Sequence, residues 1–218
     1  MTPPLLHTIA NQQLWLSPNR SLYWEEQQTL ILSDLHLGKA THFRKAGIPI
    51  PQDVFKNDIH KLTEDIQHFK PSSIIIVGDL FHSNSNIEFA LFAKWRSNFA
   101  NIPITLVMGN HDVGSHNWFA AANITVVKAW LHTPPFMFVH DYKATVLSSD
   151  YYTISGHVHP GISLKGMGRQ SLTFPCFYFA KQYAILPAYG NFTGLHIIKP
   201  NKQEAVYAVV QQEVIKVM

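Results

Sequence analysis

The chain has 218 residues, of which 46% are hydrophobic and 14% are charged, so its composition predicts a globular protein and excludes a disordered one. Its formal net charge of +3 permits an anionic substrate but does not by itself indicate one. The single cysteine, Cys176, excludes an intrachain disulfide framework, and its apolar surroundings predict a buried thiol. We find no pattern of a signal peptide and no apolar run near the ~20 residues of a membrane span, so we expect a cytoplasmic protein without membrane contact.

The first half of the chain predicts strands that alternate with helices. The segments QLWL and SLYW flank the turn sequence SPNR, so residues 13–32 are expected to form a hairpin that leads into the strand TLILS. Residues 52–69 predict a helix, because apolar residues recur there at spacings of four and three. Residues 86–100 predict a second helix, and SHNWFAAA predicts a short third one. The buried stripe expected for the second helix consists of Ile87, Leu91, Trp95 and Phe99.

Strands dominate from about residue 125 onward. They read ITVV, FMFVH, YTISG, TFPCFYFA, AILPAYG, GLHIIK, AVYAVV and EVIKVM. No linker, repeat or low-complexity tract divides the chain, so we expect residues 1–218 to form one domain. The order of elements predicts an α/β protein with two packed sheets and helices outside them.

Five apolar runs end in residues that bind metals. They are TLILS before Asp34, IIIV before Gly78-Asp79, ITLVM before GNHD, FMFV before His140 and YTIS before GHVH. Because ligands collect beyond the carboxyl ends of strands, we expect these tails to converge on one rim of one sheet. The candidate metal ligands are Asp34, His36, Asp79, Asn110, His140, His157 and His159.

Seven nitrogen and oxygen ligands exceed one tetrahedral site and suit two ions that share a carboxylate. The mixture of imidazole and carboxylate favours two divalent ions, Mn²⁺ foremost, with Zn²⁺, Fe and Co²⁺ as alternatives, over Ca²⁺. The expected reaction is in-line attack on phosphorus by a metal-bound hydroxide, for which no serine or cysteine nucleophile is needed. His111 is not required as a ligand, so we expect it to protonate the leaving oxygen or to stabilise phosphate charge.

Two basic segments follow the tails, one from Gly38 to Gly47 and the other from Lys165 to Arg169. We interpret both as loops beside the metal rim that bind substrate phosphates, and the alternative is that they are ordinary solvated loops. The candidate substrate-binding residues are Lys39, Arg44, Lys45, Lys165 and Arg169.

The motifs together resemble those of the calcineurin-like metallophosphoesterase superfamily. The resemblance rests on Asp34-x-His36, Gly78-Asp79, the GNHD string at 109–112, His140 and the GHVH string at 156–159. It implies a four-layer α/β/β/α sandwich of two mixed sheets. It also implies one ion on Asp34, His36, Asp79 and His159, and a second on Asp79, Asn110, His140 and His157, so that Asp79 bridges them.

His82 departs from the pattern of many phosphatases in this superfamily, which carry aspartate three residues after the bridging residue. The string GDLFH is similar to that of the superfamily's double-strand-break repair nucleases, which places a second imidazole near the scissile phosphate. The catalytic candidates are His111, His82 and Asp112.

The strings LHLGK, FRKAGIPIP, GDLFHS and LPAYGNFTG resemble the bacterial PdeM-type family of ligase-associated DNA damage response endonucleases. That resemblance implies DNA as substrate and a functional association with an ATP-dependent DNA ligase and a helicase.

The leading hypothesis is a dinuclear-metal-dependent phosphodiesterase, specifically a DNA endonuclease of repair. The first alternative is a phosphatase or phosphodiesterase of nucleotides or other small phosphate esters. A lipid diphosphatase is disfavoured because the chain reads GNHD where such enzymes resemble GNRD. A non-catalytic scaffold is disfavoured because scaffolds of this fold usually lose ligands or the histidine at position 111, and this chain keeps them all.

Overall fold

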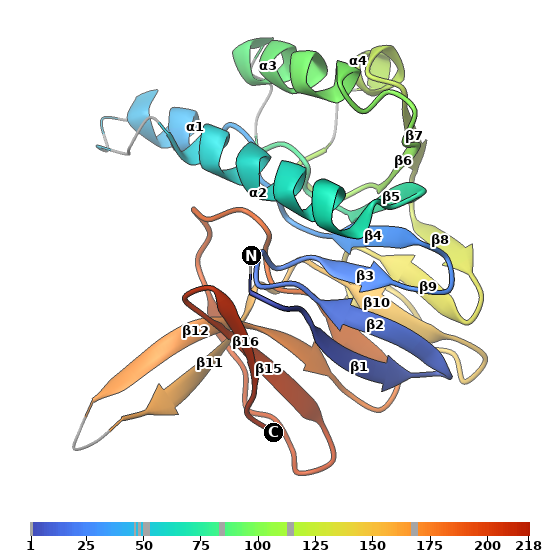
Figure 1. Ribbon diagram of the computed structural model, residues 1–218, viewed down its shortest axis with the longest axis vertical. Helices are drawn as coiled ribbons and strands as arrows, with labels where there is room; N and C mark the ends of the chain where they lie inside the picture. The colour runs from blue at the N-terminus through green and yellow to red at the C-terminus, as the bar shows by residue number, and fades with distance from the viewer. Residues whose placement is uncertain are drawn as a thin grey trace.

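Two mixed β-sheets, each built from one continuous half of the chain, pack face to face (Figure 1). The computed structural model describes residues 2–45, 47, 49, 53–82, 86–112, 116–166 and 170–218. Strands up to Val127 form the first sheet, and strands from Trp130 onward form the second. No described helix is long and apolar enough to cross a membrane.

In the part of the chain that the structure describes, the first sheet has seven strands that follow one another in chain order. They are β1 (Leu5–Ile9), β2 (Gln12–Leu16), β3 (Leu22–Trp24), β4 (Thr29–Leu32), β5 (Ser73–Val77), β6 (Ile104–Val107) and β7 (Ile124–Val127). Strands β1 to β4 pair antiparallel, and β4 to β7 pair parallel. The predicted hairpin is confirmed as β2 and β3. The sequence did not predict β1, whose residues are at most half-buried and therefore carry a weak apolar pattern.

Helices α2 (Val54–Phe69), α3 (Asn86–Ser97) and α4 (His116–Ala121) cover the outer face of the first sheet. The predicted buried stripe of α3 is wrong at Ile87 and Leu91, which are 68% and 47% exposed. Trp95 is buried as predicted and Phe99 packs against the same core, but Phe89 and Phe92 are buried in place of the other two. The face turned inward is the one whose aromatic rings pack on Phe81 and Trp118 and so bury the larger apolar area.

The first basic segment is also not a loop, because it forms helix α1 (Lys39–Lys45). Gly38, with φ of 88°, makes the turn that leads into this helix.

Among the described residues, the second sheet has nine strands. They are β8 (Trp130–Thr133), β9 (Phe136–Val139), β10 (Tyr152–Ser155), β11 (Pro160–Lys165), β12 (Ser171–Phe179), β13 (Tyr183–Ile185), β14 (His196–Ile197), β15 (Ala205–Val210) and β16 (Glu213–Lys216). Strands β9, β10 and β13 are parallel, and the long β12 pairs with β11, β13 and β15. Strands β8 and β11 were not predicted, and the strand expected in AILPAYG ends at Ile185, before Pro187.

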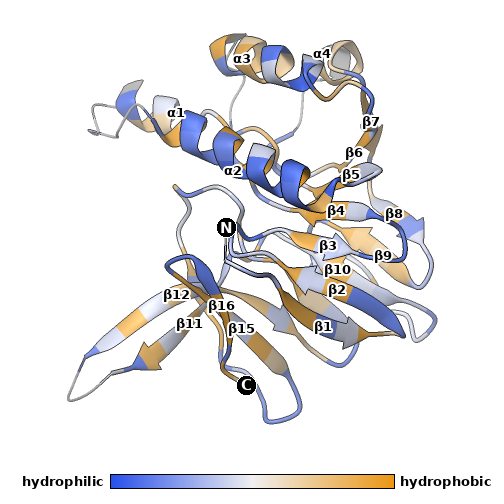
Figure 2. Ribbon diagram, in the orientation of Figure 1, coloured by the Kyte–Doolittle hydropathy of each residue, from blue (hydrophilic) through white to orange (hydrophobic). Residues whose placement is uncertain are grey.

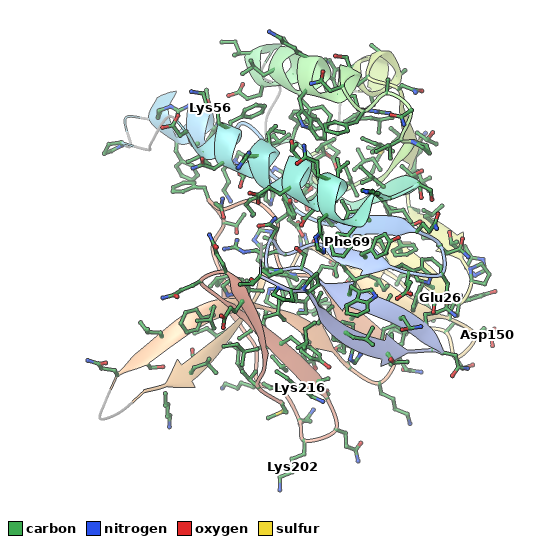
Figure 3. All side chains as sticks on the ribbon, in the orientation of Figure 1. Glu26, Lys56, Phe69, Asp150, Lys202 and Lys216 are labelled. Atoms are coloured by element: carbon green, nitrogen blue, oxygen red, sulfur yellow. The ribbon has the colours of Figure 1, made fainter. Side chains whose placement is uncertain are left out.

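Two apolar clusters of described residues hold the layers together. Alternate side chains of β4 face opposite ways, so that Leu30 and Leu32 belong to the cluster beneath the helices, while Ile31 belongs to the cluster that contains Phe136 and Phe138 of the second sheet. The apolar strands of both sheets contrast with the hydrophilic outer surface of α2 (Figure 2). Side chains fill the space beneath the helices and between the sheets (Figure 3).

The third cluster lies on the outer face of the second sheet and contains the buried Cys176, as predicted. The expected α/β class and two mixed sheets are confirmed. Among the described residues, however, the outer face of the second sheet carries the short 3₁₀ helix η1 (Tyr142–Ala144) and no α-helix, so the fourth layer of the sandwich is reduced.

Candidate metal centre

The polar tails meet where the carboxyl ends of the strands from both sheets come together. Asp34, Asp79 and Asn110 follow β4, β5 and β6 of the first sheet, whereas His140 and His157 follow β9 and β10 of the second. The expectation of one rim on one sheet is therefore wrong. The parallel strands of each half end at one edge, and the two sheets stack with these edges together.

A first cluster joins Asp34, His36 and His159. Nε2 of His159 lies 3.3 Å from Oδ1 of Asp34 and 3.2 Å from Nε2 of His36. Oδ1 of Asp34 is buried and has no hydrogen-bond partner. An orphaned carboxylate oxygen that faces two imidazole nitrogens suits a cation between them.

A second cluster joins Asp79, His140 and His157. Nε2 of His140 lies 3.4 Å from Oδ2 of Asp79, 3.1 Å from Nδ1 of His157 and 3.1 Å from Oδ1 of Asn110. Oδ2 of Asp79 also lies 3.7 Å from Nε2 of His36, in the first cluster. One carboxylate oxygen thus reaches both clusters, and all seven candidate ligands come together.

Hydrogen bonds with backbone groups orient the carboxylates of Asp34 and Asp79 and the imidazole of His140. The N–H of His157 donates to Oδ2 of Asp34, and the N–H of His111 donates to Oδ1 of Asp79, both at 2.9 Å. Each carboxylate therefore keeps its other oxygen for the clusters. Nδ1 of His140 donates to the carbonyl of Val77 at 3.1 Å, which leaves the Nε2 lone pair for a metal. The donor set fits two divalent ions.

Burial and charge set the protonation states of the metal-free clusters. Burial lowers the pKa of His36 to about 3, against the opposing effect of Asp34 and Asp79. Burial also acts to lower the pKa of His140, but its hydrogen bond to Asp79 and the two nearby carboxylates outweigh that effect and raise the pKa to about 9. The pKa of Asp79 falls to about 2, because its hydrogen bonds and His140 overcome the effect of burial. Since a ligating imidazole must be neutral, His140 would have to lose its proton to hold a metal at neutral pH.

Five candidate ligands have left-handed backbone conformations. The φ angles are 54° at Asp34, 47° at His36, 52° at Asp79, 67° at His157 and 51° at His159. Such a conformation costs a residue other than glycine roughly 1–2 kcal/mol. The turns at the strand ends adopt this conformation despite its cost, and it directs the side chains of the candidate ligands toward the metal clusters.

Glycines let these turns approach one another closely. A Cβ added to Gly78 would overlap the ring of His140, and one on Gly109 would overlap the carboxylate of Asp79. A Cβ on Gly156 would lie 2.5 Å from Oδ2 of Asp34. The glycines of the motifs are thus required by the space around the candidate ligands.

Asp112 stabilises the turns that carry the candidate ligands. It is 0% exposed, and its carboxylate accepts hydrogen bonds from the backbone N–H groups of Asp79 at 2.8 Å, Gly109 at 2.9 Å and Leu80 at 3.0 Å. These bonds tie the turn after β5 to the turn after β6. Sequence reasoning placed Asp112 among the catalytic groups, whereas its geometry is that of a positioning residue.

Further imidazoles lie beside the first cluster. The ring centroid of His111 is 4.7 Å from that of His82 and 5.2 Å from that of His36. Burial, followed by the nearby His111 and Lys39, lowers the pKa of His82 to about 4, so this ring is neutral at neutral pH. His42 was not assigned from the sequence, yet its centroid is 5.4 Å from that of His82. His42 lies three residues after Lys39, so in a helix both side chains lie on one side of α1. This relation could not be predicted from the sequence, because the segment was expected to be a loop.

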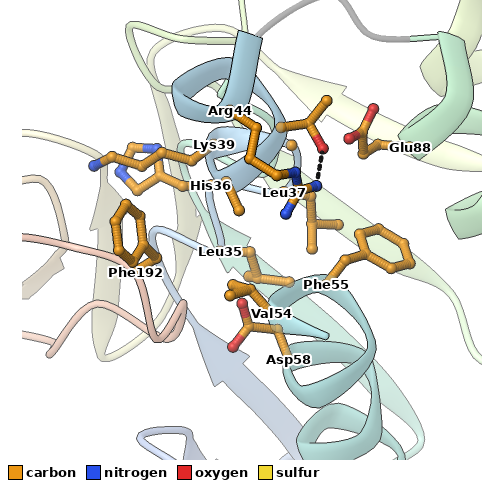
Figure 4. A pocket seen from close by; sticks show the side chains of 13 residues that line it. Leu35, His36, Leu37, Lys39, Arg44, Val54, Phe55, Asp58, Glu88 and Phe192 are labelled. Carbon is orange, nitrogen blue, oxygen red and sulfur yellow. Dashed lines mark hydrogen bonds between the residues drawn. The ribbon is translucent and has the colours of Figure 1, made fainter. Parts of the chain in front are cut away.

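The predicted substrate-binding residues are scattered. Lys39 opens α1 close enough to Asp34 and Asp79 to interact with their charges, and burial lowers its pKa. Arg44 donates to Oγ1 of Thr41 at 2.7 Å and lines a cavity of about 20 Å³ (Figure 4). Lys165 is exposed at the end of β11, five residues or roughly 17 Å along the strand from Pro160. Arg169 and the side chain of Lys45 lie outside the described residues.

Comparisons with known proteins agree with this geometry. The family model described as calcineurin-like phosphoesterase matches residues 28–190, a span that contains every residue of both clusters. Among solved structures, the chain is similar to the crystal structure of Pseudomonas putida nuclease MPE. The two share 27% sequence identity with a TM-score of 0.84, over 98% of this chain and 100% of that one. The comparison with curated proteins gives no match.

Proposed function

This chain belongs to the calcineurin-like phosphoesterase family and is a metal-dependent phosphoesterase, and we propose that it is a two-metal phosphodiesterase that cleaves DNA. The observation that carries the nuclease proposal is the similarity to the Pseudomonas putida nuclease over the whole length of both chains. We further propose that the enzyme acts in DNA repair in the cytoplasm, in functional association with an ATP-dependent DNA ligase and a helicase.

In this proposal the two clusters hold two divalent ions, Mn²⁺ foremost. The residues of one site are Asp34, His36, Asp79 and His159, and those of the other are Asp79, Asn110, His140 and His157. Bound divalent ions lower the pKa of water and neutralise phosphate oxygens. The protein itself supplies rigid orientation, because backbone groups fix the carboxylates of Asp34 and Asp79 before any ion arrives.

His111 is the proposed proton donor to the leaving oxygen. Its backbone N–H is bonded to Asp79, so its position relative to the shared carboxylate is fixed. The neighbouring His82 is neutral at neutral pH and can donate one hydrogen bond to a phosphate oxygen without adding charge. A neutral donor suits a diester, which carries one negative charge where a monoester carries up to two. Lys39 supplies a positive charge at the same rim.

Matched model substrates test this proposal. We expect the Mn²⁺-loaded protein to hydrolyse bis-p-nitrophenyl phosphate with a higher kcat/KM than p-nitrophenyl phosphate, and to cleave labelled DNA. The same assays with Zn²⁺, Co²⁺ and Fe²⁺ identify the preferred ion. A preference for the monoester together with intact DNA would favour the small-molecule phosphatase. If neither ester is hydrolysed with any of these ions, the result would favour the hypothesis of a non-catalytic scaffold.

A further inference from the structure

A groove on the outer face of the second sheet adjoins the candidate metal centre. Its volume is about 380 Å³, which lies within the roughly 300–1,000 Å³ of small-ligand sites. The residues that give it its character are Tyr142, Tyr178, Tyr183, Lys143, His196 and Lys199. This is the face that carries no α-helix among the described residues, so the groove opens to solvent.

The tyrosines of the groove form an aromatic platform. The rings of Tyr142 and Tyr183 stack with centroids 4.3 Å apart and planes 12° apart. Tyr178 meets Tyr183 edge-on, with centroids 6.0 Å apart. Tyr142 and Tyr183 are half-buried, so the pair is held in place while part of its surface remains accessible. Such platforms bind bases of any sequence by stacking, because every base has a π-face.

Positive charge borders this platform. Lys143 and Lys199 are both exposed, and Nζ of Lys143 lies 5.9 Å from the centroid of Tyr142. His196 is exposed beside them. The carboxylate of Glu204 also reaches the tyrosines, where it accepts a hydrogen bond from Tyr178. The groove therefore combines aromatic faces with two exposed lysine side chains at its edge, which matches an anionic backbone that carries bases.

The groove and the metal centre share one stretch of chain. Val158 lines the groove and packs into the third cluster, while its neighbours His157 and His159 belong to the two metal clusters. The N–H of His196 donates to the carbonyl of His159 at 2.9 Å, which joins β14 to the same stretch. Neighbouring Cα atoms are about 3.8 Å apart, so the edge of the groove at Val158 lies next to the backbone of two candidate metal ligands.

We propose that this groove binds an unpaired base next to the cleaved phosphate, with Tyr142 and Tyr183 as the stacking platform and with Lys143 and Lys199 on the backbone. A base inside a duplex is covered on both faces, so only an unpaired one can stack there. This inference rests on the proposed nucleic-acid substrate and adds to it the site that receives the strand.

Binding of labelled DNA tests the platform. The probes are a short fluorescein-labelled single strand and the blunt duplex of the same sequence, and anisotropy is measured in EDTA so that neither is cleaved. We expect Tyr142→Leu with Tyr183→Leu to raise the Kd for the single strand roughly 5- to 100-fold, and to change duplex binding far less. Tyr151→Leu is the matched control, because Tyr151 meets His132 edge-on and lines a different groove.

Exposed lysines give a second test that does not disturb packing. We expect Lys143→Ala with Lys199→Ala to lower the log–log salt slope of single-strand binding by ~1.4, since each lost phosphate contact removes ~0.7. Lys181→Ala with Lys202→Ala removes the same charge from exposed positions that do not line the groove and should leave the slope unchanged. Hydrolysis of bis-p-nitrophenyl phosphate should be the same in all variants, because that substrate has no base to stack and no extended backbone.

Each remaining outcome has a definite meaning. Wild-type cleavage of DNA together with platform and lysine variants that bind like their controls would overturn this inference alone. Absence of DNA binding by the wild type would overturn both this inference and the proposed nuclease function. Unchanged DNA binding with a changed sedimentation coefficient in the platform variants would make the groove a contact between copies of this chain, and would also overturn the inference.

Discussion

At the scale of single residues, Asp79 is the group on which both candidate ions depend. One of its oxygens reaches His36 and His140, which belong to different clusters. We expect Asp79→Asn to lower turnover of bis-p-nitrophenyl phosphate by more than roughly 100-fold and to reduce the metal content, because loss of even an outer partner of a ligand costs 10–100-fold. Asp150→Asn, at an exposed position, is the control. Two bound ions and near-normal turnover in Asp79→Asn would contradict the two-ion assignment.

His111 is expected to act on the reaction and not on metal affinity. Its ring lies beside the first cluster, but only its backbone N–H is bonded to a candidate ligand. His111→Ala should therefore keep both ions and lose ~10²–10⁴-fold in kcat, the usual contribution of a positioned acid. Metal analysis and turnover of the same sample check this, with His132→Ala as the remote control. A loss of less than about threefold would remove His111 from the mechanism.

His140 should make the stability of the metal-free protein depend on pH. Its folded pKa of about 9 exceeds its ordinary value of 6.5, so the stabilisation is complete below pH 6.5 and is lost as pH rises through about 9. The difference corresponds to stability on the order of 3 kcal/mol. In EDTA, the Tm of the wild type should fall over this range relative to that of His140→Gln. Parallel Tm curves for the two proteins would show that His140 is not protonated in the folded, metal-free state.

The sequence identified the residues that form the clusters but not the partners that hold them. Asp34 and His157 are linked although 123 positions separate them, and no local pattern encodes that contact. The structural role of Asp112 was equally hidden, because its carboxylate accepts hydrogen bonds from backbone N–H groups, and those of Asp79 and Leu80 lie in the turn after β5. Arg44 turned out to line a cavity because it lies on a helix where a loop was expected.

At the scale of elements, the turns after the strands carry the tightest constraints. A Cβ on Gly156 would meet Oδ2 of Asp34, whereas one on Gly194 would find nothing within 4 Å. Gly156→Ala should therefore cost about 1–3 kcal/mol, as overpacking does, and should also weaken metal binding. Gly194→Ala is the matched control. Thermal unfolding and metal titration check both effects, and equal behaviour of the two variants would show that the turn has room to yield.

Elements with a strong apolar period were predictable, and those set by tertiary contacts were not. The helix at α2 agrees with its period of apolar residues. Helix α3 was predicted, but its inward face was chosen by aromatic contacts with Phe81 and Trp118, which the spacing of Ile87 and Leu91 could not reveal. Strand β11 was missed because its residues pass from buried to half-buried to exposed along the strand and do not alternate.

At the scale of the whole molecule, the metal clusters depend on how the two sheets are packed. Asp34 and Asp79 come from one sheet, and the other sheet supplies His140 and His157. The expectation of a single rim failed because strand order within each half is local, whereas the stacking of the halves depends on the whole apolar core.

A matched pair of core substitutions tests this dependence. Phe177 lies between the sheets and Phe92 lies beneath the helices, and both are fully buried. Each Phe→Ala change should cost about 3–5 kcal/mol. Only Phe177→Ala should also weaken metal binding below its Tm, because it loosens the layer between the two ligand sets. Equal metal affinities in the two variants would mean that the clusters are held locally and not by the packing of the sheets.

The division of the chain at Lys128 and Ala129 has a consequence for splitting the protein. Every strand of the first sheet precedes this point and every strand of the second follows it, so a cut there severs no sheet. Each fragment would carry an incomplete set of metal ligands and an uncovered apolar face. Two contributions would therefore stabilise the reassociated pair: burial of those apolar faces, and binding of ions that neither fragment binds well alone. The two fragments of a split chain would therefore form a pair whose association can be measured by the recovery of phosphoesterase turnover. A chelator would reverse that association by removing the ions.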